Sequence, residues 1–239
     1  MNASFDVVIV GGGVTGAAVG YGLAKRGVKT CLVDAVPTFS RASRANMGLI
    51  WCQSKALGCP QFVRWGFASS RAYGNLAAEL KELSGIDTGY APTGGIIPCL
   101  GEAELEARAQ FIEKLRAETE DGTYPASVLS RKELEGMLPK VPFGPEVSGG
   151  IWSDMDGYAD PLHLMFAFRK SFVRLGGTLF AGERVSEVKP SGKGYAVVCG
   201  GRTLECGKAV LAAGLGVRKL AAQLGTDIPV FPNKSQVML

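Results

Sequence analysis

Three glycines, Gly11, Gly13 and Gly16, constrain this chain more than any other feature of its sequence. They form a G-x-G-x-x-G pattern directly after FDVVIV at residues 5–10, a β-branched run typical of a strand buried on both faces. A helical stretch follows at residues 14–26. The pattern therefore stands between a predicted strand and a predicted helix, which is the context of a dinucleotide-binding fingerprint.

The residues after this helix complete the first unit. Gly27 lies at a C-cap position, and a second apolar strand at residues 30–33 is closed by Asp34, 18 residues after Gly16. The sequence therefore predicts a β-α-β unit over residues 5–34, the beginning of a Rossmann-like α/β fold.

Each position of the fingerprint has a physical role in holding a diphosphate. Gly11 permits the tight turn from strand to helix, Gly13 lets the diphosphate approach the main chain, and Gly16 lets the helix lie close to the sheet. The first helical residues, Val14 and Thr15, offer main-chain N–H groups at the positive end of the helix dipole. We therefore expect these five residues to bind the cofactor.

Asp34, with Ala35 directly after it, is placed to bind the adenosine end of the cofactor. Its carboxylate can accept hydrogen bonds from the ribose hydroxyls, and it repels a 2′-phosphate, which disfavours NADP. NAD and FAD share this fingerprint, so the pattern alone leaves the choice between them open.

Composition excludes several classes of protein. With 46% hydrophobic and 20% charged residues in 239, the chain is not intrinsically disordered. A net charge of +4 without a basic block argues against a nucleic-acid partner. One histidine, His163, and six cysteines without a C-x-x-C pair argue against a metal site and favour a reduced, cytoplasmic protein.

Residues 7–24 carry no charge and share this property with membrane spans and signal peptides. However, Asp6 stands where a basic region would precede a signal peptide, and glycines interrupt the stretch. We therefore expect no transmembrane segment.

The remaining chain alternates helices with short strands. The periodicity predicts helices at residues 61–83, 102–118, 131–138, 161–175 and 215–224. It predicts strands at residues 88–90, 94–100, 178–181, 183–189, 195–199, 202–206 and 208–214. Val237, Met238 and Leu239 have the composition of the middle of a strand, so we expect the fold to be incomplete at the C-terminus.

Three segments together resemble the FAD-dependent D-amino acid oxidase superfamily. They are FDVVIVGGGVTGAAVGYGLAKRGVKTCLVDA at residues 5–35, DGYADPLHL at 156–164 and KAVLAAGLG at 208–216. The most similar branch contains glycine oxidase, sarcosine oxidase β-type subunits, and the opine and hydroxyproline dehydrogenase β-type subunits. The resemblance implies FAD as the cofactor.

The resemblance also implies two interleaved domains, an FAD-binding domain and an α+β substrate domain. The FAD-binding domain would comprise residues 1–84 and a return segment at 149–217. The substrate domain would comprise residues 85–148 and a second segment that starts at 218–239. Members of the family are longer than this chain, which agrees with the expected C-terminal truncation.

The loop SRASRANMGLIW, residues 40–51, matches the family segment that passes under the flavin. The match implies that Ala42 and Ser43 lie near the diphosphate and ribityl chain. It implies that main-chain groups of the three residues after Asn46 lie against the isoalloxazine ring: Met47, Gly48 and Leu49.

Two further positions carry over from the family. Val185 matches the residue whose main chain recognises adenine, and Gly214 ends a strand under the cofactor. One departure is Asp34, since the family usually has glutamate there. His163 lies in a predicted helix far from the flavin loop, so no covalent flavin link is expected.

The resemblance implies oxidation of an amine beside a carboxylate, with hydride transfer to flavin N5. The substrate would be a glycine, sarcosine, D-amino acid, hydroxyproline or opine type of molecule, and partner subunits of a hetero-oligomeric dehydrogenase are expected. This chemistry requires no catalytic base, and we assign none. Asp154 and Asp156 lie in a predicted turn, where carboxylates are most often solvated.

Two alternatives remain at this stage. An NAD-dependent dehydrogenase would share the fingerprint but continue in regular strand–helix units after Asp34. A non-catalytic flavin-binding fragment or subunit would keep the cofactor site without turnover.

Overall fold

The computed structural model describes residues 3–35, 42–119 and 122–233. The chain divides into two compact units. Unit 1 takes its described residues from Met1–Met47, Ala78–Thr88 and Asp160–Leu239. Unit 2 comprises Gly48–Ala77 and the described residues of Gly89–Ala159.

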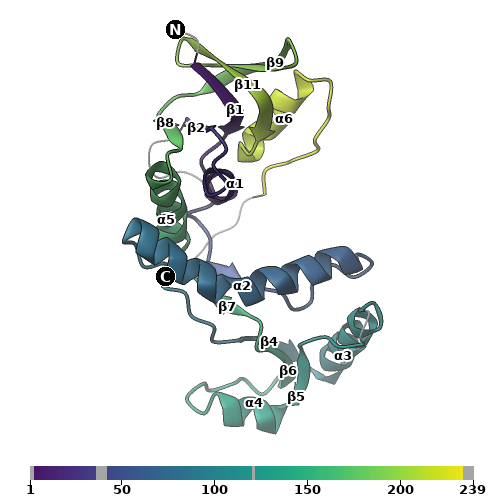
Figure 1. Ribbon diagram of the computed structural model, residues 1–239. Coiled ribbons are helices and arrows are strands. Elements are labelled where there is room, and N and C mark those ends of the chain that lie inside the picture. Colours follow the sequence, from purple (N-terminus) through teal and green to yellow (C-terminus); the bar gives the residue numbers. More distant parts are fainter. Residues whose placement is uncertain (1–2, 36–41, 120–121, 234–239) are drawn as a thin grey trace. The chain divides into compact units, whose positions relative to one another are not determined.

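Unit 1 is built on a six-stranded sheet with the order β8-β2-β1-β11-β10-β9 (Figure 1). Neighbouring strands from β8 to β11 pair in parallel, and the pairs β11–β10 and β10–β9 are antiparallel. The strands are β1 (Ala3–Val10), β2 (Thr30–Asp34), β8 (Thr178–Ala181), β9 (Val185–Ser191), β10 (Gly194–Cys199) and β11 (Arg202–Leu211).

Strand β1 is buried on both faces, as its β-branched run predicts. Val8 and Val10 belong to one hydrophobic cluster, which includes Leu220 of a C-terminal helix. Val7 and Ile9 belong to a second cluster on the other side. The alternation follows from the two-residue period of a strand and makes β1 the centre of the unit.

Helices of unit 1 cover the sheet. They are α1 (Val14–Ala24), α5 (Pro161–Arg174), the 3₁₀ turn η1 (Gly214–Gly216) and α6 (Val217–Ala222). Helices α1 and α5 pack against each other (Figure 1). A Cβ at Gly20 would lie 3.2 Å from the ring of the fully buried Phe172, so a glycine at this position lets the two helices approach closely.

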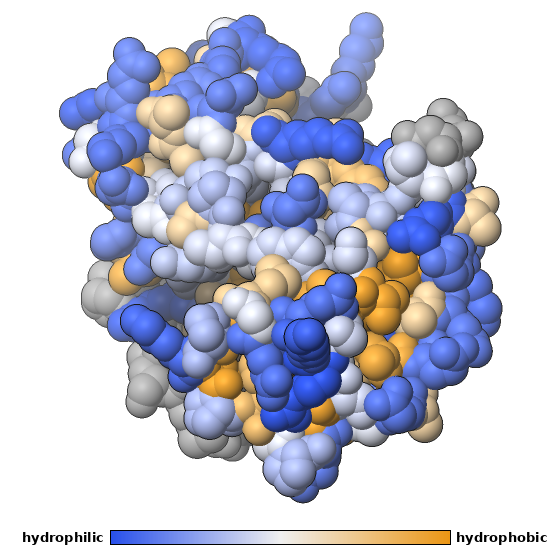
Figure 2. Space-filling model, turned by 90° about the horizontal axis from the view of Figure 1, so that it is seen from below, coloured by the Kyte–Doolittle hydropathy of each residue, from blue (hydrophilic) through white to orange (hydrophobic). Residues whose placement is uncertain are grey.

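Unit 2 contains two small antiparallel sheets. One pairs β3 (Leu49–Ile50) with β7 (Gly157–Tyr158), and the other has the order β4-β6-β5. The latter comprises β4 (Gly95–Leu100), β5 (Ser127–Ser130) and β6 (Val147–Ser153), with helices α3 (Glu102–Ala117) and α4 (Arg131–Met137). Figure 2 shows one face of the molecule, on which hydrophobic residues gather in patches between hydrophilic ones.

Helix α2 (Pro60–Ser84) contributes residues to both units. Val63 and Phe67 are buried in the cluster of unit 2, and Leu80, in the part that belongs to unit 1, is fully buried.

Most predicted elements are present, but two strand predictions are wrong and several observed strands are absent from the prediction. Residues 88–90 form no strand; instead Ala91 makes an isolated bridge to Tyr158. Four observed strands are absent from the prediction: β3, β5, β6 and β7. Three of them are short, and β6 contains two adjacent glycines. The two strands predicted at 202–206 and 208–214 are the single strand β11, which β1 pairs from Leu204 to Leu211.

The limits of the two units differ from the expected domain limits. Residues 48–77 and 149–159 lie in unit 2. For residues 149–153 the reason is that they belong to β6, which pairs with β4 and β5 of the same unit. Described residues from 218 onward lie in unit 1, where Leu220 joins its core. The strand expected at 237–239 lies outside the described residues.

Cys31 generates a prediction about alkaline stability. It is fully buried in β2, and burial raises the pKa of its thiol from 9.0 to about 12. Between these values the unfolded chain has lost a proton that the folded chain keeps, so the free energy of unfolding falls as pH rises above 9. We expect Cys31→Val to make this decrease shallower in urea titrations from about pH 7 to about pH 10.5.

The matched control is Leu32→Val, which truncates the next fully buried side chain of β2 and removes no titratable group, so it should keep the alkaline slope of the wild type. An equal slope in the wild type and Cys31→Val would contradict the assignment.

Candidate functional site

The turn after β1 requires glycine at two places. Gly11 has φ +107°, and a Cβ there would lie 2.4 Å from the main-chain oxygen of Ala212. A Cβ at Gly16 would lie 1.9 Å from the main-chain oxygen of Gly11. Helix α1 can therefore begin this close to the turn only because Gly11 and Gly16 have a hydrogen atom in place of a side chain.

The start of α1 presents main-chain N–H groups. Gly13 is the N-cap, and the first helical hydrogen bond runs from the Ala17 N–H to its carbonyl. The N–H groups of Val14, Thr15 and Gly16 therefore have no acceptor within the helix. Val14 to Ala17 are uncharged, so no carboxylate in this turn competes with an anion for the positive end of the helix.

Ser43 lies directly against this helix start. Its hydroxyl accepts a hydrogen bond from the Val14 N–H at 3.0 Å. A Cβ at Gly13 would lie 2.8 Å from the same oxygen. The loop that carries Ser43 thus places a hydroxyl beside the main chain at the predicted diphosphate position.

Asp34 lies at the end of β2 and is 5% exposed. Its carboxylate lies over the turn, since a Cβ at Gly12 would be 2.6 Å from Oδ2. Its main-chain oxygen accepts from the Glu183 N–H at 3.1 Å, two residues before Val185. Ala35 is half-buried beside it. The structure therefore brings the predicted ribose and adenine positions to one edge of the sheet.

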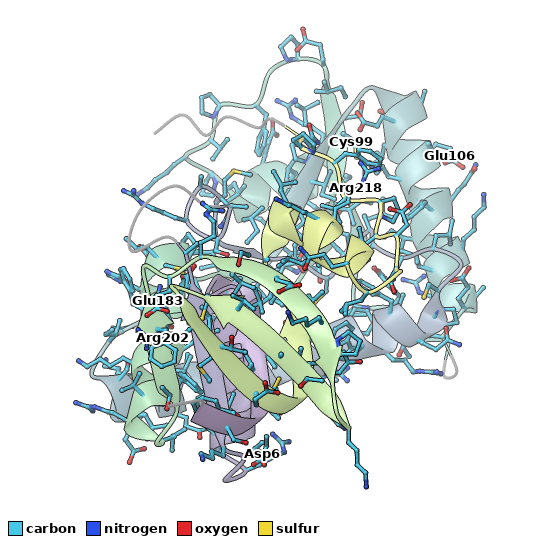
Figure 3. All side chains as sticks on the ribbon, turned by 90° about the horizontal axis from the view of Figure 1, so that it is seen from above. Asp6, Cys99, Glu106, Glu183, Arg202 and Arg218 are labelled. Atoms are coloured by element: carbon cyan, nitrogen blue, oxygen red, sulfur yellow. The ribbon has the colours of Figure 1, made fainter. Side chains whose placement is uncertain are left out.

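The segment before Val185 has a second anchor. Glu183 forms an ion pair with Arg202 of β11, with 3.1 Å between Oε1 and Nη2, and Figure 3 shows the two side chains together. The Arg202 guanidinium also lies 4.8 Å from the centre of the Phe180 ring. These contacts fix the connection from β8 to β9.

Arg169 is a residue of this site that the sequence analysis does not identify. Its Nη1 lies 3.2 Å from Oδ2 of Asp34, and both side chains are less than 10% exposed. It stands on the buried face of α5 with Met165 and Phe172, three to four residues away on either side. A charge on an apolar helical stripe is the signal that could have identified it.

Gly214 also lies at this edge. The Ala212 N–H at the end of β11 donates to the Val10 carbonyl at 2.8 Å, and Gly214 follows with φ +56° at the start of η1. The carboxyl ends of parallel strands β1, β2 and β11 therefore meet where the fingerprint lies, as in ligand sites of α/β sheets.

The predicted flavin-loop residues divide between the units. Ala42 and Met47 are exposed residues of unit 1. Gly48 and Leu49 belong to unit 2, where Gly48 has φ +69° and its carbonyl accepts from the Ala159 N–H at 2.9 Å. The positive φ explains a glycine at residue 48 without reference to a ligand.

Asp156 corrects the expectation that both turn carboxylates are solvated. It is 1% exposed and accepts hydrogen bonds from the main-chain N–H of Cys52 at 2.6 Å and from Nε2 of Gln53 at 2.8 Å. Asp154 is exposed, as expected. Asp156 differs because it ties the segment after β3 to β7, a contact across 104 residues of sequence.

The described residues show neither a metal centre nor a membrane-spanning helix. No group of three or more His, Cys, Asp or Glu side chains among them could hold a metal ion. No helix among them has the length and apolar character needed to cross a membrane.

Comparison with known proteins decides the family. A family model described as FAD dependent oxidoreductase (DAO) matches residues 6–239. The chain belongs to this family. FAD is therefore its cofactor, as the resemblance implied, and the alternative of an NAD-dependent dehydrogenase is wrong.

Similar proteins include the B subunit of the opine oxidase of Rhizobium meliloti, 34% identical over 235 residues, which are 98% of this chain and 62% of that protein. Glycine oxidase of Geobacillus kaustophilus is 28% identical over 239 residues and is likewise covered to 62%. Its crystal structure gives a TM-score of 0.85 over 94% of this chain. The chain thus spans about three fifths of the length of these relatives, and the predicted α/β fold is confirmed.

The geometry of unit 1 fits an FAD diphosphate and ribose. A Cβ at Gly12 or Gly13 would collide with Asp34 or Ser43, so glycine at these positions lets both side chains lie against the main chain of the turn. A helix start with main-chain N–H groups and a buried carboxylate at the end of β2 are the donor and acceptor groups that a diphosphate and a ribose would need.

Alanine substitutions at two glycines of α1 should have opposite effects on stability, because only one of these glycines lies against the turn. Gly16→Ala places a Cβ 1.9 Å from main-chain oxygen, which forces α1 away from the turn and should cost about 1–3 kcal/mol with loss of bound flavin. At Gly22 the nearest atom to an added Cβ is 3.7 Å away, so Gly22→Ala should stabilise α1 by about 0.5–1 kcal/mol. Urea unfolding and the flavin content of each purified variant measure both effects.

Full flavin content in Gly16→Ala would contradict the role of this close approach.

Proposed function

We propose that this chain is the flavin-binding part of an enzyme that oxidises the C–N bond of an amino acid or secondary amine, with an opine-type substrate favoured. The observation that carries the proposal is the 34% identity to the B subunits of two opine oxidases over 98% of the chain. Glycine oxidases match less closely, at 28% and below. Opines and glycine, the compounds in these names, share a C–N bond beside a carboxylate.

When bound, FAD supplies the two-electron acceptor, which takes the substrate hydride at flavin N5. The chain's own residues bind and orient the cofactor. Gly13, Val14, Thr15 and Ser43 would hold the diphosphate through N–H groups and a hydroxyl, at the helix start where they gather. Asp34 would bind the adenosine ribose.

The other predicted contacts stay part of this proposal. Val185 would bind adenine through its main chain, because its segment is tied to Asp34. Main-chain groups of Met47, Gly48 and Leu49 would face the isoalloxazine ring. The remaining contacts are small residues that let the cofactor lie close: Gly11, Gly16, Ala35, Ala42 and Gly214.

We assign the diphosphate and adenosine parts of the cofactor to unit 1 and substrate binding to unit 2. A partner subunit is also part of the proposal, since the relative in Rhizobium meliloti is named a subunit. Large exposed apolar side chains support further contacts, among them Trp65 at 71% and Leu100 at 62% exposure. Free cysteines, most of them buried, fit the predicted cytoplasmic compartment.

Anaerobic reduction of the bound flavin tests the proposal. We expect an opine to bleach the flavin absorbance bands of the purified protein faster than glycine, sarcosine, D-proline or hydroxyproline. The matched control is the ether analogue of the opine, in which an oxygen atom replaces the amine nitrogen; it lacks the C–N bond and should leave the bands unchanged.

Bound flavin that no amine reduces would contradict the proposed reaction and favour a non-catalytic role in flavin binding. Reduction by glycine alone would keep the reaction class and contradict the opine preference.

A further inference from the structure

An ion pair at the end of β2 links the predicted ribose-binding residue to a helix far away in sequence. Nη1 of Arg169 lies 3.2 Å from Oδ2 of Asp34, and 135 residues separate the two. The side chains are 9% and 7% exposed, so water screens the pair weakly.

Packing alone does not explain an arginine at this position of α5. Among the other buried positions of this helix, Ser171 is a small polar residue and the rest are apolar: Leu164, Met165, Ala167, Phe168 and Phe172. Burial of a guanidinium costs free energy that an apolar residue would not cost, so the charge requires a partner. The carboxylate of Asp34 is such a partner.

The pair also fixes how Asp34 points. Its Oδ2 lies against the turn, 2.6 Å from where a Cβ at Gly12 would stand, and Arg169 approaches the same oxygen from α5. A guanidinium presents its N–H donors in a rigid plane, so it restrains the rotation of a bound carboxylate more than an ammonium does.

We propose that Arg169 is a positioning residue of the dinucleotide site: it holds the Asp34 carboxylate in the orientation that accepts the adenosine ribose 2′-hydroxyl. The proposal rests on the FAD site and is independent of the substrate. It gives α5 a role in cofactor affinity in addition to packing.

The test compares two nucleotides that differ at one hydroxyl. Titration calorimetry of ADP and 2′-deoxy-ADP into flavin-free protein measures how strongly the site recognises the ribose. We expect the wild type to bind ADP more tightly than 2′-deoxy-ADP. In Arg169→Met the ratio of the two affinities should fall about tenfold, which is the effect of one charge-assisted hydrogen bond. Binding of 2′-deoxy-ADP should change little.

The matched control is Arg174→Met on the same helix. It removes the same charge, but Arg174 donates to the main-chain oxygen of Leu83 and not to Asp34. We expect its preference for ADP to equal that of the wild type.

A cycle with Asp34→Ala shows whether Arg169 acts through the carboxylate. In that background, adding Arg169→Met should leave the ratio of the two affinities unchanged. If Arg169→Met does not fold, Arg169→Lys replaces it: the charge is kept, the planar fork is lost, and the preference for ADP should fall below that of the wild type.

Equal weakening of both nucleotides in Arg169→Met, or an unchanged ratio in Arg169→Lys, would overturn the positioning role while leaving the FAD site intact. Absence of ADP binding to the wild type would overturn the dinucleotide site itself, and the positioning role with it.

Discussion

The structure of unit 1 depends on the close approach of α1 to the turn that follows β1. A Cβ at Gly16 would lie 1.9 Å from the Gly11 carbonyl oxygen, so the helix can start where it does only because Gly16 lacks a side chain. This approach brings the N–H groups of the helix start, which have no acceptor within α1, to the carboxyl ends of three parallel strands. This arrangement is the basis of the diphosphate site that we propose.

Charges of opposite sign are placed at the two ends of this site. The helix start is the positive end of the helix dipole and has no charged residue in its first turn, so it is suited to a diphosphate. Asp34 supplies a negative group where the ribose is expected, and Arg169 compensates its burial from a helix of the same unit. Separation of these charges along one sheet edge would orient an FAD molecule in a single direction.

Local features of this fold could be predicted from the sequence, and contacts between distant segments could not. The strand, glycine turn and helix of residues 5–34 follow from residues within a few positions of one another. Asp156 accepts from Cys52 across 104 residues and Arg169 pairs with Asp34 across 135, so the residues around each of them do not indicate its partner. Strand β6 has two adjacent glycines and therefore a weak local signal, and its pairing with two other strands stabilises it as a strand.

Titration of FAD into the flavin-free chain tests directly whether unit 1 binds the cofactor. Quenching of flavin fluorescence should show one FAD bound per chain, and FMN should bind more weakly because it lacks the adenosine part that Asp34 is placed to recognise. Absence of FAD binding, or equal affinity for FAD and FMN, would contradict the site described for unit 1.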